Sequence, residues 1–382
     1  MKVFLLTSTR ADFGLLSNLI IEIKKNKKIN LKVIVTGSHL SKKHGLSFKE
    51  IKKKKINVFK SIKISNNVAL PKFLMNDFSY LSKKISFLIQ KYKPNLFILL
   101  GDRYEVLSVA LTAYISKIPI AHIHGGEITS GSLDDGFRHC ISKLSSIHFV
   151  SHSSYKKRLI QLGENPKTVF NVGALGIENI FKTQFLSKNE LEKKLKVKFK
   201  NKILSICLHP EITSSLTLKL VNETLFALEK HNDKSLIFTL PGTDQHNLII
   251  FNKLYKFAKN RKNVHIYKSL GSRNYLSLLK ISDGLIGNSS SGIIEMPTFR
   301  KPTINIGTRQ EGRIQSQSII NVDINREEIN RKINLIYQKK IKTNIRNPYK
   351  QNFTSKKIVS LINNLKVDNL SPKKFFDVYF KS

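Results

Sequence analysis

The chain has 382 residues, of which 41% are hydrophobic and 24% are charged, and its formal net charge is +40. This length permits two domains, each with its own core, and this hydrophobic content argues against global disorder. Of the 66 basic residues only 12 are arginine, and the lysines are scattered rather than interleaved with aromatic side chains. We therefore interpret the charge as solvated faces and expect no nucleic-acid partner.

Cysteine usage and hydropathy exclude further classes. Cys140 and Cys207 are the only cysteines and lie far apart, so they predict neither a disulfide framework nor a zinc site. The first apolar run ends at Thr7, and no later run is long enough to span a membrane. We expect a cytoplasmic protein without a membrane partner.

Short apolar runs alternate with helix-like stretches along the whole chain, a pattern typical of parallel α/β sheets. In the first half, strands are predicted at Lys2–Leu6, Leu31–Val35, Leu96–Leu100, Ile118–Ala121, Ile147–Val150 and Val169–Val172. In the second half, they are predicted at Ile203–Leu208, Ser235–Leu240, Val264–Tyr267, Gly284–Ile286, Thr303–Ile306 and Ile319–Val322. Helices are predicted at Leu15–Lys25, Leu81–Tyr92 and Leu216–Lys230.

These elements predict two Rossmann-like domains, at residues 1–178 and 179–355, followed by a helical tail at 356–382 that could pack on either domain. Neither half has a GxGxxG or GxxxxGK[ST] motif, so dinucleotide redox chemistry and P-loop phosphate transfer are not expected. An interdomain cleft would suit a nucleotide-linked sugar, with one domain holding the nucleotide and the other the reacting sugar.

Polar loops follow several of the predicted strands in the first half. Gly101-Asp102-Arg103 follows one strand, and His122-Ile123-His124-Gly125-Gly126-Glu127 follows the next. Ligands of open α/β sheets bind at the carboxyl ends of the strands, so both loops should face one crevice. Each carboxylate also has a structural alternative: Asp102 could only orient Arg103, and Asp134 or Asp135 could cap a helix. Clustered with histidines and arginine, they favour acid–base catalysis.

Other loops have features of anion-binding sites. Thr7–Gly14 and Asn288–Glu295 each join a strand to a helix start, where backbone N–H groups and hydroxyls bind phosphate, although both could be ordinary capped turns. His39 and His209 follow strands in the two halves and are candidates for the same crevice. Because arginine is scarce here and grips a diphosphate through two N–H groups, its placement in these loops is informative. The arginines concerned are Arg10, Arg103, Arg138, Arg309 and Arg313.

Taken in order, these motifs resemble the hydrolysing UDP-N-acetylglucosamine 2-epimerases of sialic-acid biosynthesis. The matching strings are TSTRADFG, TGSHL, GDRYEVL, IPIAHIHGGEITSGSLDDGFRHCISKLS, LGENPKTVFNVGALG, HPEIT, GNSSSGIIE and NIGTRQEGR, between residues 7 and 313. The resemblance implies a GT-B-like α/β fold. The non-hydrolysing epimerases differ, with an EAGLRTG-like string in place of HGGEITSG.

The resemblance implies elimination of UDP from UDP-N-acetylglucosamine to 2-acetamidoglucal, followed by hydration to N-acetylmannosamine. It implies that Asp102 and Asp134 are the acid–base carboxylates, and that His209 supports the reacting sugar or the leaving phosphate. It further implies that the diphosphate and ribose are held by Arg10, Ser289, Ser290, Arg309 and Glu295. We also expect His39, Arg103, Arg138, Gly292 and Arg313 to contribute to substrate binding. No metal or cofactor is expected, and relatives suggest a homodimer or tetramer.

One departure from the family pattern affects the chemistry. Many relatives have HIEGGE where this chain has His124, so either His124 or Glu127 takes over the proton transfer of the missing glutamate. The departure also leaves the sugar open. UDP-N-acetylglucosamine is the preferred substrate, and UDP- or GDP-linked 2,4-diacetamido-2,4,6-trideoxyglucose, of legionaminic-acid synthesis, is the alternative. A GT-B glycosyltransferase would share the fold, but the GDR and HGGE loops argue against it.

Overall fold

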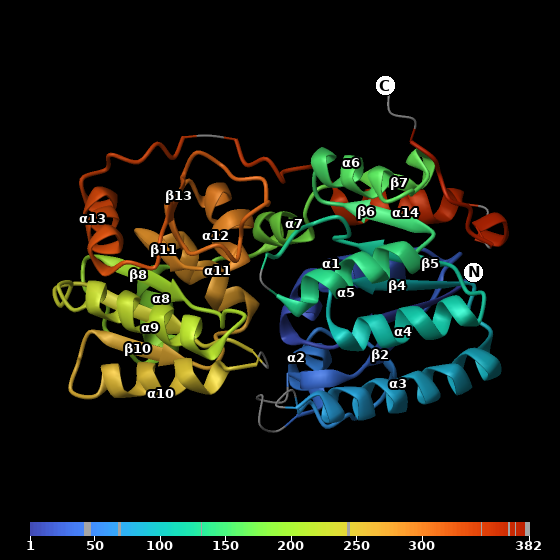
Figure 1. Ribbon diagram of the computed structural model, residues 1–382, viewed down its shortest axis with the longest axis horizontal. Coiled ribbons are helices and arrows are strands. Elements are labelled where there is room, and N and C mark those ends of the chain that lie inside the picture. Colours follow the sequence, from blue (N-terminus) through green and yellow to red (C-terminus); the bar gives the residue numbers. More distant parts are fainter. Residues whose placement is uncertain are drawn as a thin grey trace. The chain divides into compact units, whose positions relative to one another are not determined.

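The computed structural model describes two compact units. The described residues are 1–41, 47–67, 70–130, 132–242, 245–344, 346–365, 367–370 and 372–378. The first unit consists of Met1–Glu127, Leu133–Asn179 and Gln351–Ser382, and the second of Ile128–Ser132 and Ile180–Lys350. Each unit contains its own parallel sheet with helices on both faces (Figure 1). The final segment of the chain thus belongs to the first unit and is not a separate body.

The first unit is built on a seven-stranded parallel sheet in the order β3-β2-β1-β4-β5-β6-β7. Its strands are β1 (Lys2–Thr7), β2 (Asn30–Val35), β3 (Val58–Ser61), β4 (Leu96–Leu100), β5 (Ile120–Ile123), β6 (Ile147–Val150) and β7 (Val169–Asn171). Every residue of β4, β5 and β6 is buried, as expected for central strands covered by helices on both faces.

The helices of the first unit follow the strands in sequence. They are α1 (Arg10–Lys24), α2 (Phe48–Lys53), α3 (Pro71–Tyr92), α4 (Tyr104–Ile115), α5 (Leu133–Leu144), α6 (Ser153–Gln161), α7 (Leu175–Lys182, which crosses the unit boundary) and α14 (Thr354–Asn364). Short 3₁₀ turns lie at Gly37–Leu40, Pro166–Thr168 and Val367–Leu370. Among the described residues, no helix is long and apolar enough to cross a membrane.

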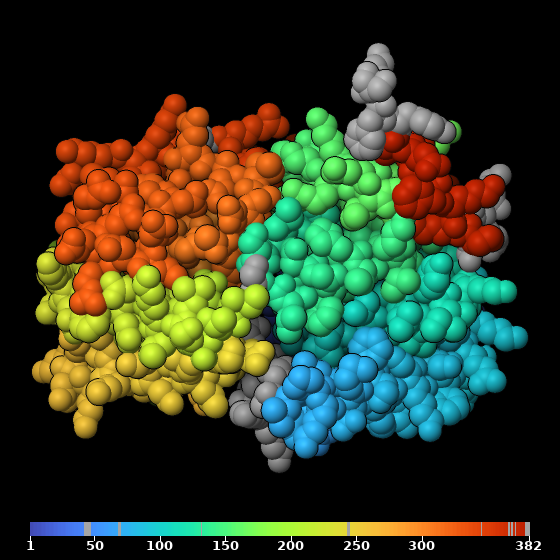
Figure 2. Space-filling model, in the orientation of Figure 1, coloured from blue at the N-terminus to red at the C-terminus, as the bar shows by residue number. Residues whose placement is uncertain are grey.

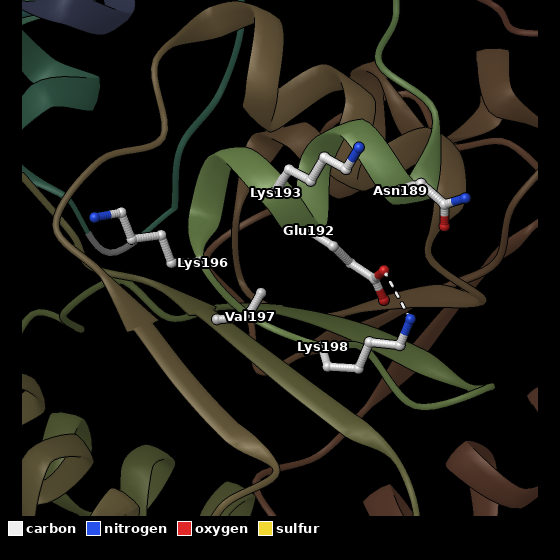
Figure 3. Close-up of a pocket in the computed structure, with 6 residues that line it drawn as sticks. All are labelled: Asn189, Glu192, Lys193, Lys196, Val197 and Lys198. Atoms are coloured by element: carbon white, nitrogen blue, oxygen red, sulfur yellow. Dashed lines mark ion pairs between the residues drawn. The ribbon is translucent and has the colours of Figure 1, made fainter.

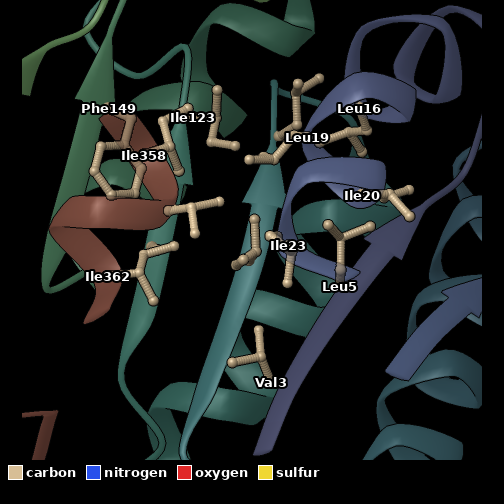
Figure 4. Close-up of a cluster of buried hydrophobic side chains, with 14 of the residues drawn as sticks. Val3, Leu5, Leu16, Leu19, Ile20, Ile23, Ile123, Phe149, Ile358 and Ile362 are labelled. Atoms are coloured by element: carbon tan, nitrogen blue, oxygen red, sulfur yellow. The ribbon is translucent and has the colours of Figure 1, made fainter. Parts of the chain in front are cut away.

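Helix α14 completes the core of this unit. Its buried residues Ile358 and Ile362 join Leu19 and Ile23 of α1 and Phe149 of β6 in one apolar cluster (Figure 4). The helix is therefore held by burial of its apolar face, at roughly 1.5–3 kcal/mol for each fully buried Ile or Leu.

The second unit repeats the plan with six parallel strands in the order β10-β9-β8-β11-β12-β13. They are β8 (Ile203–Cys207), β9 (Ser235–Thr239), β10 (Val264–Tyr267), β11 (Gly284–Gly287), β12 (Thr303–Ile306) and β13 (Ile319–Val322). The helices are α8 (Lys188–Leu195), α9 (Ser214–Leu228), α10 (Asn247–Ala258), α11 (Ser272–Ile281), α12 (Ser290–Ile294) and α13 (Arg326–Tyr337), with a 3₁₀ turn at Met296–Phe299.

The predicted α/β class with two Rossmann-like halves is confirmed, and all twelve predicted strands are present within two residues at each end. The strand missing from the prediction is β3. It has the sequence VFKS, lies at the edge of the sheet and is only partly buried, so it lacks the apolar run that marks the central strands.

Candidate active site

Both sheets reverse their strand order at one point, and the candidate site residues lie around these two points. In the first unit the reversal lies between β1 and β4, and in the second between β8 and β11. The crevice outside the carboxyl ends of strands at such a reversal is the usual ligand site of open α/β sheets. The loops that follow these four strands contain Arg10, Asp102, His209 and Ser289.

The loop after β1 is a capped helix start. Thr9 is the N-cap of α1 and forms a capping box with Asp12, whose carboxylate accepts hydrogen bonds from the Ser8 hydroxyl at 2.8 Å and the Thr9 amide at 3.0 Å. Burial raises the pKa of Asp12, and the Arg103 guanidinium opposes this rise. Arg10 is partly exposed and its Nε lies 2.9 Å from a carboxylate oxygen of Glu50.

The loop after β4 places Arg103 on Glu105 rather than on Asp102. Arg103 Nε lies 3.1 Å from Glu105 Oε2, and the Glu105 side chain is fully buried at the start of α4. Burial raises the pKa of Glu105, and the nearby Arg103 cation opposes the rise. The ion pair that the structure shows for Asp102 is with Arg138.

Four candidate residues form one connected cluster after β4 and β5. Arg138 of α5 makes an ion pair with Asp102 and donates a hydrogen bond to the His124 carbonyl at 3.0 Å. His124 Nδ1 lies 3.0 Å from Glu127 Oε1, and Arg138 is 3.9 Å from the other Glu127 oxygen. The Arg138 side chain is 4% exposed while that of Asp102 is 23% exposed, so the carboxylate of Asp102 is the accessible end of the pair.

His124 combines a strained backbone with a buried ring nitrogen that has no partner in the described part of the chain. Its φ is +65°, a conformation that costs a non-glycine residue of order 1–3 kcal/mol and is concentrated at functional sites. Its buried Nε2 has no hydrogen-bond partner among the residues that the structure describes. Because Glu127 holds Nδ1, the ring is oriented with Nε2 as its available nitrogen.

Glu127 is less suited to contact a substrate. Its side chain is 2% exposed, and Oε1 accepts hydrogen bonds from Ser151 at 2.7 Å as well as from the His124 ring. Ser151 follows β6, and the rule that polar residues at carboxyl ends of strands converge would have identified it.

His39, which the sequence predicts as a substrate ligand, is fully buried within the first unit. Its Nε2 lies 2.9 Å from Thr7 Oγ1 and its Nδ1 lies 2.7 Å from Ser47 Oγ. Burial lowers the pKa of His39 to about 4, so the ring is neutral at pH 7. We interpret His39 as a residue that positions the loop after β1.

His122 is likewise enclosed. Its Nε2 lies 2.7 Å from the Gly101 carbonyl and its Nδ1 lies 3.0 Å from Ser142 Oγ. Burial lowers its pKa to about 3. His122 therefore ties the residue before Asp102 to helix α5.

Asp134 lies in the first turn of α5, partly buried, with Asp135 beside it. The same helix carries Arg138 one turn later. Helix α5 thus provides a candidate acid–base carboxylate and the cation that holds Asp102.

In the second unit, Asn288 links the loops after β8 and β11. Its Oδ1 accepts a hydrogen bond from the His209 amide at 2.7 Å, and its Nδ2 donates to the His209 carbonyl at 2.9 Å and to Glu211 at 2.8 Å. Gln310 in turn donates to the Asn288 carbonyl at 2.9 Å. Asn288, Glu211 and Gln310 were not among the predicted site residues, although each follows a strand.

Gly287 allows the ends of strands β8 and β11 to lie close together. Its φ is +137°, and a Cβ placed there would lie 2.0 Å from the Cys207 carbonyl oxygen. Any side chain at this position would therefore force β11 away from β8 and separate His209 from Asn288.

Cys207, the last residue of β8, contacts the His209 ring, with Sγ 3.6 Å from His209 Nε2. Burial of the thiol acts to raise its pKa, but His209 and the neighbouring hydroxyls outweigh burial and lower it to about 7. Cys207 and His209 therefore form a polarised pair at the end of β8.

The serine loop after β11 has the form predicted for an anion site. Ser289 is the N-cap of α12 and accepts a hydrogen bond from the Ser291 amide at 3.3 Å. Gly292 packs against β12, where a Cβ would lie 2.5 Å from Thr303. Ser290 and Glu295 are partly exposed at the start and end of this short helix.

The loop after β12 contributes two arginines with different surroundings. Arg309 is partly exposed and its charge counteracts the burial that raises the Glu211 pKa. Arg313 instead donates to the Ile128 carbonyl at 3.0 Å and to Thr129 Oγ1 at 3.2 Å. These contacts hold Ile128 and Thr129, and a contact of Arg313 with substrate stays a prediction.

A separate surface hollow of the second unit contains none of the candidate residues. It is lined by Asn189, Glu192, Lys193, Lys196, Val197 and Lys198, and Lys198 Nζ lies 3.6 Å from Glu192 (Figure 3). Its lysine ammonium groups are mostly solvated, and we assign it no function.

The sequence matches the family model described as UDP-N-acetylglucosamine 2-epimerase over residues 21–363. A protein of Campylobacter jejuni subsp. jejuni, named GDP/UDP-N,N'-diacetylbacillosamine 2-epimerase (hydrolyzing), is 43% identical over 330 residues, which are 85% of each chain. The polysialic acid biosynthesis protein P7 of Escherichia coli is 34% identical over 99% of this chain and 97% of its own. In Legionella pneumophila, a UDP-N,N'-diacetylbacillosamine 2-epimerase (hydrolyzing) is 30% identical over 86% of each chain.

Solved structures share the fold at lower sequence identity. The UDP-GlcNAc 2-epimerase of Neisseria meningitidis, bound to UDP-GlcNAc, superimposes with a TM-score of 0.79 at 20% identity, covering 95% of this chain and all of that one. The corresponding Methanocaldococcus jannaschii enzyme gives a TM-score of 0.81, also at 20% identity, over 95% of this chain and 99% of that one. These neighbours have the GT-B-like arrangement of two parallel-sheet halves that was predicted.

Proposed function

Because this chain belongs to the hydrolysing branch of the UDP-N-acetylglucosamine 2-epimerase family, we propose that it acts on nucleotide-linked N,N'-diacetylbacillosamine. The products would be 2,4-diacetamido-2,4,6-trideoxymannose and a free nucleoside diphosphate. Two of the relatives described above are named for this sugar, and one of them has the 43% identity. N,N'-diacetylbacillosamine is 2,4-diacetamido-2,4,6-trideoxyglucose, the alternative sugar of the sequence analysis. These two relatives support it better than they support UDP-N-acetylglucosamine, which the motifs favoured.

The observation that carries the proposed reaction is the cluster of Asp102, Arg138, His124 and Glu127. A 2-epimerase must exchange a proton at C2 and break the bond between C1 and the diphosphate, so it needs several proton-transfer groups close together. The cluster provides the partly exposed carboxylate of Asp102, held by the buried Arg138. It also provides His124, which is held by the buried Glu127 and whose Nε2 has no partner in the described part of the chain.

The reaction has two steps. In the first, a base takes the C2 proton as the C1–O bond breaks, so that a C1=C2 double bond forms and the nucleoside diphosphate leaves with the bonding electrons. In the second, water adds at C1 and a proton is delivered to C2 from the opposite face, which inverts that centre. Asp102 and Asp134 are assigned to these proton transfers, with His124 as the third group.

We assign His124, rather than Glu127, to the role of the missing family glutamate. Glu127 is buried and already accepts two hydrogen bonds, whereas His124 presents Nε2 without a partner in the described part of the chain. Glu127 then orients the imidazole, as a carboxylate beside a histidine does in other enzymes.

The second unit is assigned to the nucleotide. Ser289, Ser290 and Gly292 form the start of α12, Arg309 supplies a partly exposed cation, and Glu295 is placed to accept from ribose hydroxyls. His209 is fixed through its backbone by Asn288, its ring lies against Cys207, and we assign that ring to the leaving diphosphate. The partly exposed Arg10 at the start of α1 is assigned to phosphate binding.

The test is a proton NMR time course of the purified protein in deuterated water, with UDP- and GDP-linked N,N'-diacetylbacillosamine and with UDP-N-acetylglucosamine in parallel. The proposal expects release of the nucleoside diphosphate and a free manno sugar carrying deuterium at C2. Turnover of UDP-N-acetylglucosamine alone would restore the substrate that the motifs favoured. A nucleotide-linked product would contradict the hydrolytic reaction. The dimer or tetramer remains a prediction, to be tested by sedimentation.

A further inference from the structure

The segment of residues 372–378 returns to the first unit and contacts the end of helix α5. The Phe376 amide donates to the Gly163 carbonyl at 3.0 Å, and Phe375 packs on Gly163, where a Cβ would lie 2.3 Å from its ring. Lys143 Nζ lies 4.3 Å from the centre of the Phe375 ring. Figure 2 shows these red C-terminal residues lying against green residues of the same unit.

Lys373 is the polar centre of this contact. Its side chain is 14% exposed, and Nζ lies 2.5 Å from Glu164 Oε2 and 2.6 Å from the Lys143 carbonyl. The Ser142 carbonyl is a longer contact at 3.5 Å. The last carbonyls of a helix lack partners within it and carry partial negative charge, so an ammonium group placed there anchors the helix end.

Glu164 fixes the ammonium in place. Its side chain is 1% exposed, and it also contacts His148 Nε2 at 2.9 Å and Lys143 Nζ at 3.4 Å. A buried carboxylate with three polar partners is costly to disturb, because loss of one partner leaves the charge under-compensated. The position of Lys373 is therefore defined by the protein interior rather than by solvent.

The helix held in this way carries part of the candidate active site. Asp134 lies in its first turn, Arg138 in its middle makes the ion pair with Asp102, and Ser142 in its last turn contacts His122 at 3.0 Å. His122 in turn contacts the carbonyl of Gly101, the residue before Asp102. A displacement of α5 along its axis would move both assigned carboxylates.

We propose that Lys373 is a positioning residue of the reaction, which fixes helix α5 and thereby the relative placement of Asp102 and Asp134. It does not touch the reacting atoms. A misplacement of about 1 Å in a catalytic group is enough to lower a rate up to about a hundredfold, so the contact need not be near the chemistry to affect it. The expected change in kcat rests on the proposed function, whereas the expected change in amide hydrogen exchange of α5 does not.

The experiment compares Lys373→Ala and Lys373→Arg with Lys374→Ala, an exposed neighbour that serves as the matched control. The expected result for Lys373→Ala is a fall in kcat of about tenfold, with KM and the Kd for UDP within about twofold of wild type. Lys373→Arg should recover most of kcat, and Lys374→Ala should match wild type. Ser142 links Lys373 to His122, so the two substitutions should affect the same contact. The double variant Lys373→Ala/Ser142→Ala should therefore lose less kcat than the product of the two single losses.

Amide hydrogen exchange provides a readout that needs no substrate. In Lys373→Ala, the backbone amides in the last turns of α5 should exchange faster than in wild type. Those in α9 of the second unit should exchange at the wild-type rate. The proposal is overturned if kcat and α5 exchange stay at wild-type values, or if kcat falls only together with the melting temperature and UDP affinity. If wild type turns over none of the three nucleotide sugars, the proposed function fails, and the exchange result alone decides the role of Lys373.

Discussion

The two strand-order reversals of this protein are alike in topology and opposite in chemistry. Around β1 and β4, carboxyl groups are held by guanidinium groups, as in the Arg138–Asp102 and Arg103–Glu105 pairs. Around β8 and β11, the loops are joined by the neutral amide of Asn288. In the proposed function, one sheet plan therefore supports a reactive site in the first unit and a binding site in the second, and the loop residues rather than the fold decide which.

The largest expected effect is on the reactive side of this comparison. Asp102→Asn should lower kcat by about a thousandfold while leaving the Kd for UDP within about twofold, because the amide keeps the shape but cannot take a proton. Steady-state kinetics and calorimetric UDP titration measure the two values. Equal losses in kcat and UDP affinity would show that the two sites are not chemically separate.

His124 sharpens the assignment within the reactive site. His124→Ala should lower kcat by about a hundredfold, whereas His124→Glu, which restores the family residue, should retain measurable turnover. The kcat of Glu127→Gln should lie between those of wild type and His124→Ala, because this variant loses the carboxylate that orients the His124 ring but keeps the ring itself. A Glu127→Gln variant with less activity than His124→Ala would transfer the catalytic role to Glu127.

The enclosed histidines predict a pH effect on stability. The folded pKa of His39 is about 4, against about 6.5 when unfolded, so the unfolded chain binds the proton first as the pH falls. The free energy of unfolding should therefore decrease from pH 6.5 towards pH 4, with about 2 kcal/mol lost at pH 5 through His39. Urea midpoints at pH 7.5 and 5 should show a smaller decrease in His39→Gln than in wild type. His246→Gln, at a partly exposed position, is the control, and an unchanged decrease in His39→Gln would contradict the prediction.

The smallest expected effect is on the binding side. Arg309→Lys should raise KM for the nucleotide sugar about tenfold with kcat nearly unchanged, because an ammonium cannot make the paired contacts of a guanidinium with a diphosphate. The exposed Arg331→Lys is the control. A fall in kcat instead would place Arg309 among the groups that act only in the transition state.

Much of the fold and part of the site could be predicted from the sequence, for physical reasons. Central strands such as β4 are continuous apolar runs, and polar residues after them converge because parallel strands end at one edge. In the structure Asp102, His124 and Glu127 all contact Arg138, and their roles in catalysis stay predictions.

Pairings between distant segments could not be predicted in the same way. His39 and Arg313 each follow a strand, but nothing in the sequence indicates that His39 contacts Ser47 or that Arg313 donates to the Ile128 carbonyl. Likewise, the docking of α14 on α1 depends on matching apolar faces more than 300 residues apart, for which a single sequence gives no register.

The place of α14 also has a consequence for the order in which the newly made chain can mature. The residues of the second unit are all synthesised before Ile358 and Ile362, so that unit can finish folding while the first still lacks a helix of its core. Until then, Leu19 and Ile23 of α1 have no complete cover and are available to chaperones or to aggregation. On the ribosome, the half of the enzyme that is made first is therefore the half that becomes native last.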